Sequence, residues 1–220
     1  MPAALLVAST RSHADARETL RIQDVAGVLV DAGWKVDLLV PRPSALLTAT
    51  LSADVRVVPV PRLPLSSMPP RRPSVRRFLV GAMMFLRGTA LVSRNGYSIV
   101  HGFNDGALVA RAIDRATLSR FPYIADFTDP FGVRGLYRGF RAAVARHFEH
   151  AAMRHAAAVI FADAETPPML VRKVPPARVS VIPDPHAEIA PEAFTRAEFA
   201  EALARIYAYA TREDRYPQGK

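Results

Sequence analysis

Seven short, largely apolar runs that alternate with segments of helical spacing constrain the fold of this chain more than any other feature. Six of the apolar runs lie at residues 3–9, 35–40, 55–58, 97–102, 157–162 and 179–183, and another begins at Tyr123. Helical patterns cover residues 14–32, 74–92, 105–118, 135–155 and 168–173. Strands that alternate with helices form parallel sheets, because the crossover helices pack on the sheet faces. The sequence therefore predicts an α/β fold: a doubly wound, mostly parallel, Rossmann-like sheet of about seven strands with helices on both faces.

Length and composition favour one large domain. The chain has 220 residues, half of them apolar, and it has no cysteine, so disulfides and thiolate metal sites are excluded. Its first residues lack the charged start and the cleavage site of a signal peptide, and no run approaches the roughly 20 apolar residues of a membrane span. We therefore expect a cytoplasmic protein that is soluble or bound peripherally at the inner membrane face.

The most informative stretch is Tyr123 to Gly132, an apolar run that ends in two acids, a proline and a glycine. Pro130 cannot continue the hydrogen-bond ladder of a strand, so Asp126, Thr128 and Asp129 should lie at or just past the strand's carboxyl end. Ligands bind at this edge of open α/β sheets. The alternative is structural: Asp129 and Pro130 start a turn, and Asp126 caps a neighbouring helix.

Two other predicted strands also end in polar side chains. Because the carboxyl ends of central parallel strands meet at one edge, we expect a single substrate-binding pocket there. Its predicted residues are Thr10, Arg11, Ser12 and His13 after the first strand, His101, Asn104 and Asp105 at the fourth, and Asp126, Thr128 and Asp129 at the fifth. Asn104 and Asp105 are also expected to cap the helix that follows them.

Several common site motifs are absent. The tip of the first strand, Ser9 to His13, contains no glycine, so the phosphate loop of an NAD or FAD site does not follow it. The loop of P-loop nucleotide triphosphatases and the nucleophile elbow of the usual α/β-hydrolases are also missing. His147, His150 and His155 have no cysteine or tight carboxylate group to complete a metal site. The sequence therefore predicts neither a cofactor nor a metal.

Arginine supplies nearly all of the positive charge, and the formal net charge is +9. The span from Arg62 to Arg94 contains no acidic residue, which suggests an anionic partner. Within it, residues 74–92 have the pattern of an amphipathic basic helix, with apolar positions at Val75, Phe78, Leu79, Ala82 and Leu86. One interpretation is an anionic membrane contact through Arg71, Arg72, Arg76, Arg77 and Phe78. The other is an ordinary surface helix with a solvated arginine face, and nucleic acid is not favoured.

Four pieces of the chain carry a resemblance to a known family, at residues 97–101, 123–132, 149–165 and 179–184. In order and spacing they resemble the amino-terminal domain of GT-B glycosyltransferases, specifically the large retaining family 4. Tyr97 to His101 resembles the family's strand Y-D-V-V-H, and Tyr123 to Gly132 resembles the A-D-F-R-D-P-W-G variant of the next strand. Glu149 to Glu165 resembles the helix-strand unit E-x-x-x-x-R-x-A-D-A-V-I with its V-S-E tip. Val179 to Asp184 resembles V-x-V-I-P-N, the strand that ends the first domain. The resemblance covers about residues 3–186.

The resemblance implies a division of the chain into two parts. In the family, a second domain that holds the nucleotide sugar follows V-I-P-N, whereas here about 34 residues remain. Phe194 to Tyr207 resembles the final helix of such enzymes, which packs back on the first domain. We therefore expect a GT-B-like amino-terminal domain at 1–186 and a carboxyl-terminal helix and tail at 187–220.

The resemblance lends no catalytic residue, because Thr10 and Arg11 replace the usual G-G, and Thr128 stands where many members carry histidine. We expect the acceptor-side half of a glycosyltransferase that transfers a hexosyl group from a nucleotide sugar to a glycan or lipid-linked acceptor. It would need a separate donor-domain subunit, since half a cleft can position the acceptor but cannot stabilise the departing diphosphate. The alternative is a non-catalytic binding or scaffold remnant that docks on a membrane or on a full-length transferase.

Overall fold

The structure, a computed structural model, describes residues 1–10, 16–42, 47, 51–61, 73–118, 120–128, 140–162, 174–183, 185 and 194–212. The strands are β1 (Ala3–Val7), β2 (Lys35–Val40), β3 (Val55–Pro59), β4 (Ile99–Phe103), β5 (Tyr123–Phe127), β6 (Ala158–Phe161) and β7 (Val179–Val181). The helices are α1 (Ala16–Asp31), α3 (Pro73–Arg94), α4 (Gly106–Ala116), α5 (Phe140–His155), α7 (Arg196–Ala210) and the short 3-10 helix η2 (Pro176–Arg178).

The seven strands form one parallel sheet in the order β3-β2-β1-β4-β5-β6-β7. The order reverses between β1 and β4, which is the switch point of a doubly wound sheet. The residues of β1, β4, β5 and β6 are all buried, as expected for strands that are covered on both faces. The predicted fold class is confirmed.

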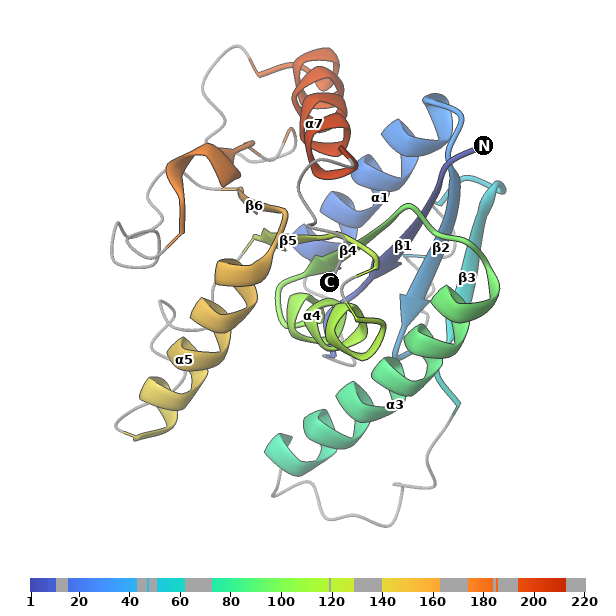
Figure 1. The fold of residues 1–220 in the computed structure, drawn as a ribbon. Helices are drawn as coiled ribbons and strands as arrows, with labels where there is room; N and C mark the ends of the chain where they lie inside the picture. Colours follow the sequence, from blue (N-terminus) through green and yellow to red (C-terminus); the bar gives the residue numbers. More distant parts are fainter. Residues whose placement is uncertain are drawn as a thin grey trace.

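Helices cover both faces of the sheet (Figure 1). On one face α3, α4 and α5 pack against a core that includes Leu5, Val100 and Phe127. On the other face α1 and α7 pack against a core that includes Leu6 and Ile124. The helix at 196–210 thus lies on the same side of the sheet as the first helix of the chain.

Helices α1 and α7 have the local signals that their sequences predict. After α1, Gly33 adopts φ +80°, and the amide of Trp34 donates to the Leu29 carbonyl, so the helix ends at a left-handed glycine. At the start of α7, Thr195 accepts from the Glu198 amide and the Glu198 carboxylate accepts from the Thr195 amide. This capping box fixes where α7 begins.

The buried face of α3 differs from the predicted apolar face. Phe78 and Leu86 were expected on the apolar stripe, but they are 76% and 60% exposed. Instead Met84 is buried, and the Cα of Gly88 faces the side chains of Ile113 and Leu39 so closely that a Cβ would collide with Ile113. The periodicity was ambiguous because apolar residues occur all round this helix, and tertiary contact with α4 selects the face that contains glycine.

Several sequence predictions lie outside the described residues. They include Arg71 and Arg72 of the predicted membrane contact, and the short helix predicted at 168–173. Arg76 and Arg77 belong to α3, but their side chains are not described. No described helix is long and apolar enough to cross a membrane.

Candidate functional site

The end of β1 is tied to the start of α4 by the carboxylate of Asp105. The amide of Thr10 donates to Asp105 Oδ1 at 2.9 Å, and the hydroxyls of Ser9 and Thr10 donate to Asp105 Oδ1 and Oδ2, respectively. Asp105 occupies the N-cap position of α4, but its side chain makes no cap hydrogen bond. The prediction that Asp105 caps this helix is confirmed for its position, but its carboxylate accepts hydrogen bonds from the β1 tip and none from the amides of α4.

A second carboxylate holds the same edge from α1. Glu18 Oε1 accepts from the Ser9 amide at 2.9 Å, and Glu18 Oε2 accepts from Asn104 Nδ2 at 2.8 Å. The same side-chain nitrogen, Asn104 Nδ2, also donates to Thr128 Oγ1 at 2.9 Å. These contacts join the tips of β1, β4 and β5 to the first turn of α1.

Close backbone approach explains why this edge is so compact. A Cβ on Gly106 would lie 2.4 Å from the Val7 carbonyl oxygen and 2.6 Å from that of Ala8. A Cβ on Gly102 would lie 2.6 Å from the backbone of Ala107. Only glycine permits α4 to start this close to β1 and β4, and that closeness brings Asp105 to the β1 tip.

A separate buried network lies under α7, on the face shared by α1 and α7. Arg21 Nε donates to Asp126 Oδ2 at 3.1 Å, and Arg21 Nη1 donates to the carbonyls of Ile182 and Pro183 at 3.0 and 3.3 Å. His101 Nε2 lies 3.3 Å from Asp126 Oδ2, and His101 Nδ1 lies 2.8 Å from the Tyr207 hydroxyl oxygen. The network thus links α1, β4, β5, the end of β7 and α7.

The charge states in this network follow from burial and from the charged partners. Burial raises the pKa of Asp126, but the charge of Arg21 and the hydrogen bond with His101 outweigh it and bring the pKa below its usual value. Burial lowers the pKa of His101, and burial raises that of Tyr207 well above its usual value. An ionised Asp126 requires a proton on His101 Nε2, so Nδ1 accepts from the Tyr207 hydroxyl.

The structure divides the predicted pocket residues into these two groups. Thr10, Asn104, Asp105 and Thr128 lie together at the carboxyl edge. His101 and Asp126 have no exposed surface and lie in the packed layer under α7. The two groups adjoin, since the backbone amide of Asn104 donates to the backbone carbonyl of Asp126 at 2.7 Å. Arg11, Ser12, His13 and Asp129 lie outside the described residues.

Four residues of these networks were missed from the sequence: Ser9, Glu18, Arg21 and Tyr207. Glu18 and Arg21 had a usable signal, because they fall on the same helical stripe as the apolar positions Ile22 and Val25. A charge on a buried stripe needs a partner. Ser9 and Tyr207 had no comparable signal.

The chemistry open to the described part of the edge is limited. The carboxylates of Asp105 and Glu18 both accept hydrogen bonds from neighbouring groups, so they hold the strand tips in place. Among the described residues, no group of three or more His, Cys, Asp or Glu side chains could hold a metal ion. The described edge is therefore suited to positioning, and it flanks residues 11–15 and 129–139, which are outside the described ranges.

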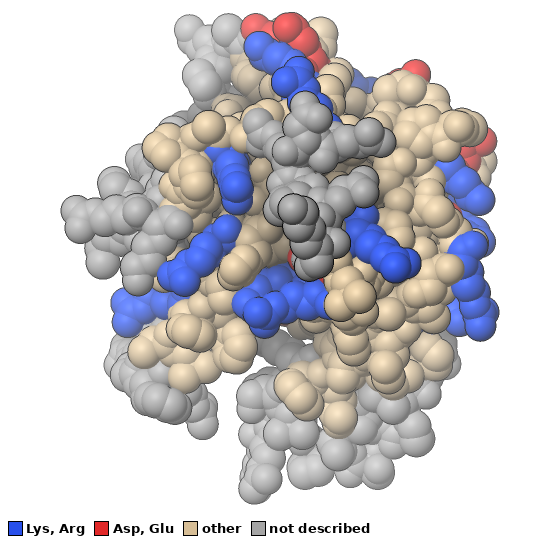
Figure 2. All heavy atoms as spheres, in the orientation of Figure 1, with Lys and Arg blue, Asp and Glu red and all other residues tan. Residues whose placement is uncertain are grey.

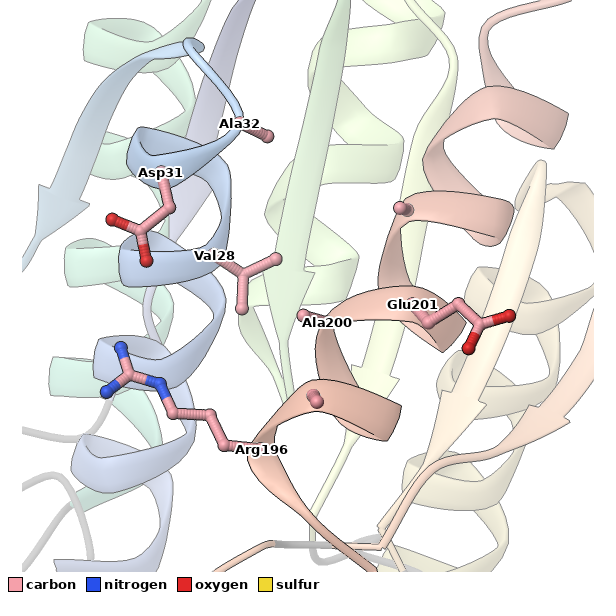
Figure 3. A pocket seen from close by; sticks show the side chains of 8 residues that line it. Val28, Asp31, Ala32, Arg196, Ala200 and Glu201 are labelled. Atoms are coloured by element: carbon pink, nitrogen blue, oxygen red, sulfur yellow. The ribbon is translucent and has the colours of Figure 1, made fainter.

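A surface groove lies away from this edge, between α1 and α7 (Figure 3). Its apolar lining consists of Val28 of α1, Ala32 just after α1, and three alanines of α7, and its charged side chains are Asp31, Arg196 and Glu201. None of the predicted pocket residues lines it.

Comparison with solved structures places the fold among GT-B glycosyltransferases. A sucrose-phosphate synthase from Thermosynechococcus elongatus has a TM-score of 0.57 and 17% identity, over 83% of this chain and 47% of that one. A fragment of the same synthase, labelled 27–220 and 406–426, has a TM-score of 0.59 and 16% identity, over 94% of this chain and 98% of the fragment. MurG from Acinetobacter baumannii has a TM-score of 0.55 and 12% identity, over 86% of this chain and 47% of that one. The chain thus spans about half the length of the two full-length neighbours.

The sequence comparisons are consistent with that fold. The search of curated proteins gave no match. A family model described as "Glycosyl transferase 4-like domain" matches residues 19–185, which is most of the chain and includes β2 to β7. The chain belongs to the glycosyl transferase 4-like domain family.

Proposed function

We propose that this chain is the acceptor-side half of a glycosyltransferase, which transfers a sugar from a nucleotide sugar to a glycan or lipid-linked acceptor only together with a separate donor-binding domain. The main support for this proposal is the short connection between β7 and α7. The seven-stranded sheet ends at Val181, and α7 begins at Arg196 after a connection at residues 182–195. That connection is too short to contain a second domain.

The similarity to the synthase fragment supports this division. The fragment's label names two ranges, 27–220 and 406–426, and this chain covers 98% of the fragment. We infer that β1 to β7 correspond to a first domain at 1–186, and that α7 belongs to a carboxyl-terminal part at 187–220 that packs back on it. The contacts of Tyr207 with His101 and of Phe199 with Arg21 are consistent with this inference.

The acceptor would bind at the carboxyl edge. Thr10 and Thr128 lie there beside Asn104 and Asp105, and the segments with Arg11, Ser12, His13 and Asp129 continue from the same strand tips. An acceptor hydroxyl has to be oriented before it can attack the donor sugar, and a fixed set of strand tips can provide that orientation. His101 and Asp126 would not contact the acceptor. From the packed layer under α7 they would hold the backbone of β4 and β5 in place.

A peripheral membrane contact belongs to the same proposal, because a lipid-linked acceptor would be presented at a membrane. Phe78 and Leu86 are exposed on α3, in the segment that also contains Arg76 and Arg77. Sedimentation with anionic liposomes tests the contact. We expect binding at low salt that weakens when Arg71, Arg72, Arg76 and Arg77 are changed to Glu, and binding unchanged by that reversal would rule out the electrostatic anchor.

The transferase proposal is tested by co-expression with the protein encoded by the adjacent reading frame. If that protein supplies a donor-binding domain, the two should co-purify and transfer sugar together. Co-purification with a full-length transferase whose activity does not depend on this chain would instead favour the non-catalytic scaffold. Thr10→Val and Thr128→Val should weaken acceptor use by the pair, because each removes a hydroxyl at the acceptor edge.

A further inference from the structure

The amino edge of the sheet, opposite the candidate site, carries a group of positive side chains from three elements. We call this group the amino-edge basic cluster: Arg111 and Arg115 of α4, Arg154 and His155 of α5, and Arg178 of η2. Helices α4 and α5 return the chain to the amino ends of β5 and β6, so their last turns meet at this edge. Val159 of β6 pairs with Val179 of β7, which places Arg178 beside the start of β6. His155 precedes β6 by only a few residues, so Arg178 and His155 lie at the same edge.

The four arginines have no protein partner within the described part of the chain. The ion pairs found there involve Arg21, Arg56, His101 and Arg205, and none involves this cluster. Arg111 Nε is buried and has no hydrogen-bond partner. In the view of Figure 2, Lys and Arg side chains gather over the region of α4 and α5, whereas most of the visible acidic side chains lie near the upper and right edges.

The negative carboxyl ends of the helices offset only part of the positive charge of this cluster. The carboxyl ends of α4 and α5 each carry a partial charge of about −0.5, so together they offset roughly one of the four guanidinium charges. Asp114 of α4 is buried nearby and offsets one more. A positive excess therefore remains. Consistent with this, partial burial lowers the pKa of His155, and the charges of Arg111, Arg115, Arg154 and Arg178 lower it further.

We propose that the amino-edge basic cluster binds a small, soluble phosphate-class anion that carries two or more negative charges. Guanidinium forks match the oxygens of phosphate in charge and in geometry, and Arg115 and Arg154 are exposed at this edge, so an anion in solution can reach them. The site lies on the opposite edge of the sheet from the candidate acceptor site, so it is independent of the proposed function.

The test uses the full chain and inorganic pyrophosphate at constant ionic strength. The readout is the pKa of His155, followed by NMR and assigned with a His155→Gln variant. A bound anion would reverse the effect of the arginines, so we expect saturating pyrophosphate to raise this pKa by about one unit or more. Sulfate at the same ionic strength should raise it much less.

Matched variants separate the site from general charge. The double variant Arg115→Gln with Arg154→Gln should raise the dissociation constant for pyrophosphate by roughly tenfold for each guanidinium removed. Arg178→Gln alone should raise it by roughly tenfold. The control is Arg87→Gln with Arg205→Gln, which makes the same change in net charge at exposed positions on α3 and α7 and should leave binding unchanged.

Three results would overturn the proposal. They are no change at His155 with millimolar pyrophosphate, equal binding by the cluster variant and the control variant, and an equal response to sulfate. Binding only to phosphatidylglycerol vesicles, with none to pyrophosphate, would also overturn it and would assign the cluster to a lipid surface.

Discussion

The hydroxyl oxygen of Tyr207 lies 2.8 Å from Nδ1 of His101, although the two residues are 106 positions apart in the chain. Both side chains are buried, so this hydrogen bond connects the last described helix to a central strand of the sheet. Through His101 Nε2 it continues to Asp126 and from there to Arg21 of α1. The position of α7 is thus fixed by a polar network as well as by apolar packing.

The tautomer of His101 can be measured directly. We predict that Nε2 carries the proton and that Nδ1 is an acceptor, because Asp126 is ionised and Tyr207 keeps its proton. Tyr207→Phe should leave Nδ1 without a donor and reduce the free energy of unfolding by about 1–3 kcal/mol. The ¹⁵N chemical shifts of the ring report the tautomer, and a proton on Nδ1 in the native chain would contradict this assignment.

Arg21 and Asp126 form a buried ion pair, and removing one partner should be costly. Arg21→Met leaves the Asp126 carboxylate buried without its main counter-charge, so we expect the free energy of unfolding in urea to fall by about 3–5 kcal/mol. Arg205→Met is the matched control, because Arg205 and its partner Glu201 are largely exposed with an N–O separation of 4.0 Å. It should cost less than about 1 kcal/mol. Similar losses in both variants would show that Arg21 contributes no more than a surface charge.

Acid should destabilise the chain through His101. Burial lowers the pKa of His101 in the folded state, so below pH ~6.5 the unfolded chain binds a proton that the folded chain does not. The stability is therefore present above that pH and is lost as the pH falls, with a slope of about 1.4 kcal/mol per pH unit for this one group. His155 contributes in the same direction, so the measurement is made in a His155→Gln background. A flat profile between pH 6.5 and about 4.5 would be inconsistent with a neutral buried His101.

The start of α4 should tolerate no side chain at residue 106. Gly106→Ala places a Cβ against the backbone oxygens of Val7 and Ala8, so the helix or the strand must move. We expect a loss of about 1–3 kcal/mol or more in unfolding experiments, with weakened contacts between Asp105 and Thr10. Gly27→Ala in α1 is the control, because its Cβ would meet only the flexible end of Arg196. The control should be neutral or stabilising by about 0.5–1 kcal/mol.

The sheet and its helices were predictable from the sequence, because the apolar runs form strands that are buried in the middle of the sheet and partly buried at its edges, and helical patterns separate them. The polar tips at Thr10, Asn104 and Thr128 were predictable for the same reason, since parallel strands end at one edge. The role of Tyr207 was not predictable, because it depends on where α7 docks and no local pattern encodes that position. Likewise the exposed Phe78 was placed on the wrong face of α3, because a helix with apolar residues all round has no single inner face until its neighbours are known.

The proposal that the chain supplies only the acceptor side of the reaction can be tested on the chain alone. The most direct measurement is a turnover assay of the purified chain alone, with a panel of UDP-, GDP- and ADP-sugars and with glycan and lipid-linked acceptors. Released nucleotide diphosphate and glycosylated product are followed by mass spectrometry, with a full-length GT-B enzyme assayed in parallel. We expect no hydrolysis and no transfer by the chain alone, because none of the described residues at the acceptor edge can stabilise a departing diphosphate. Sugar transfer by the purified chain without any partner, lost on changing Thr10 or Thr128, would contradict the account and would mean that this domain contains a complete active site.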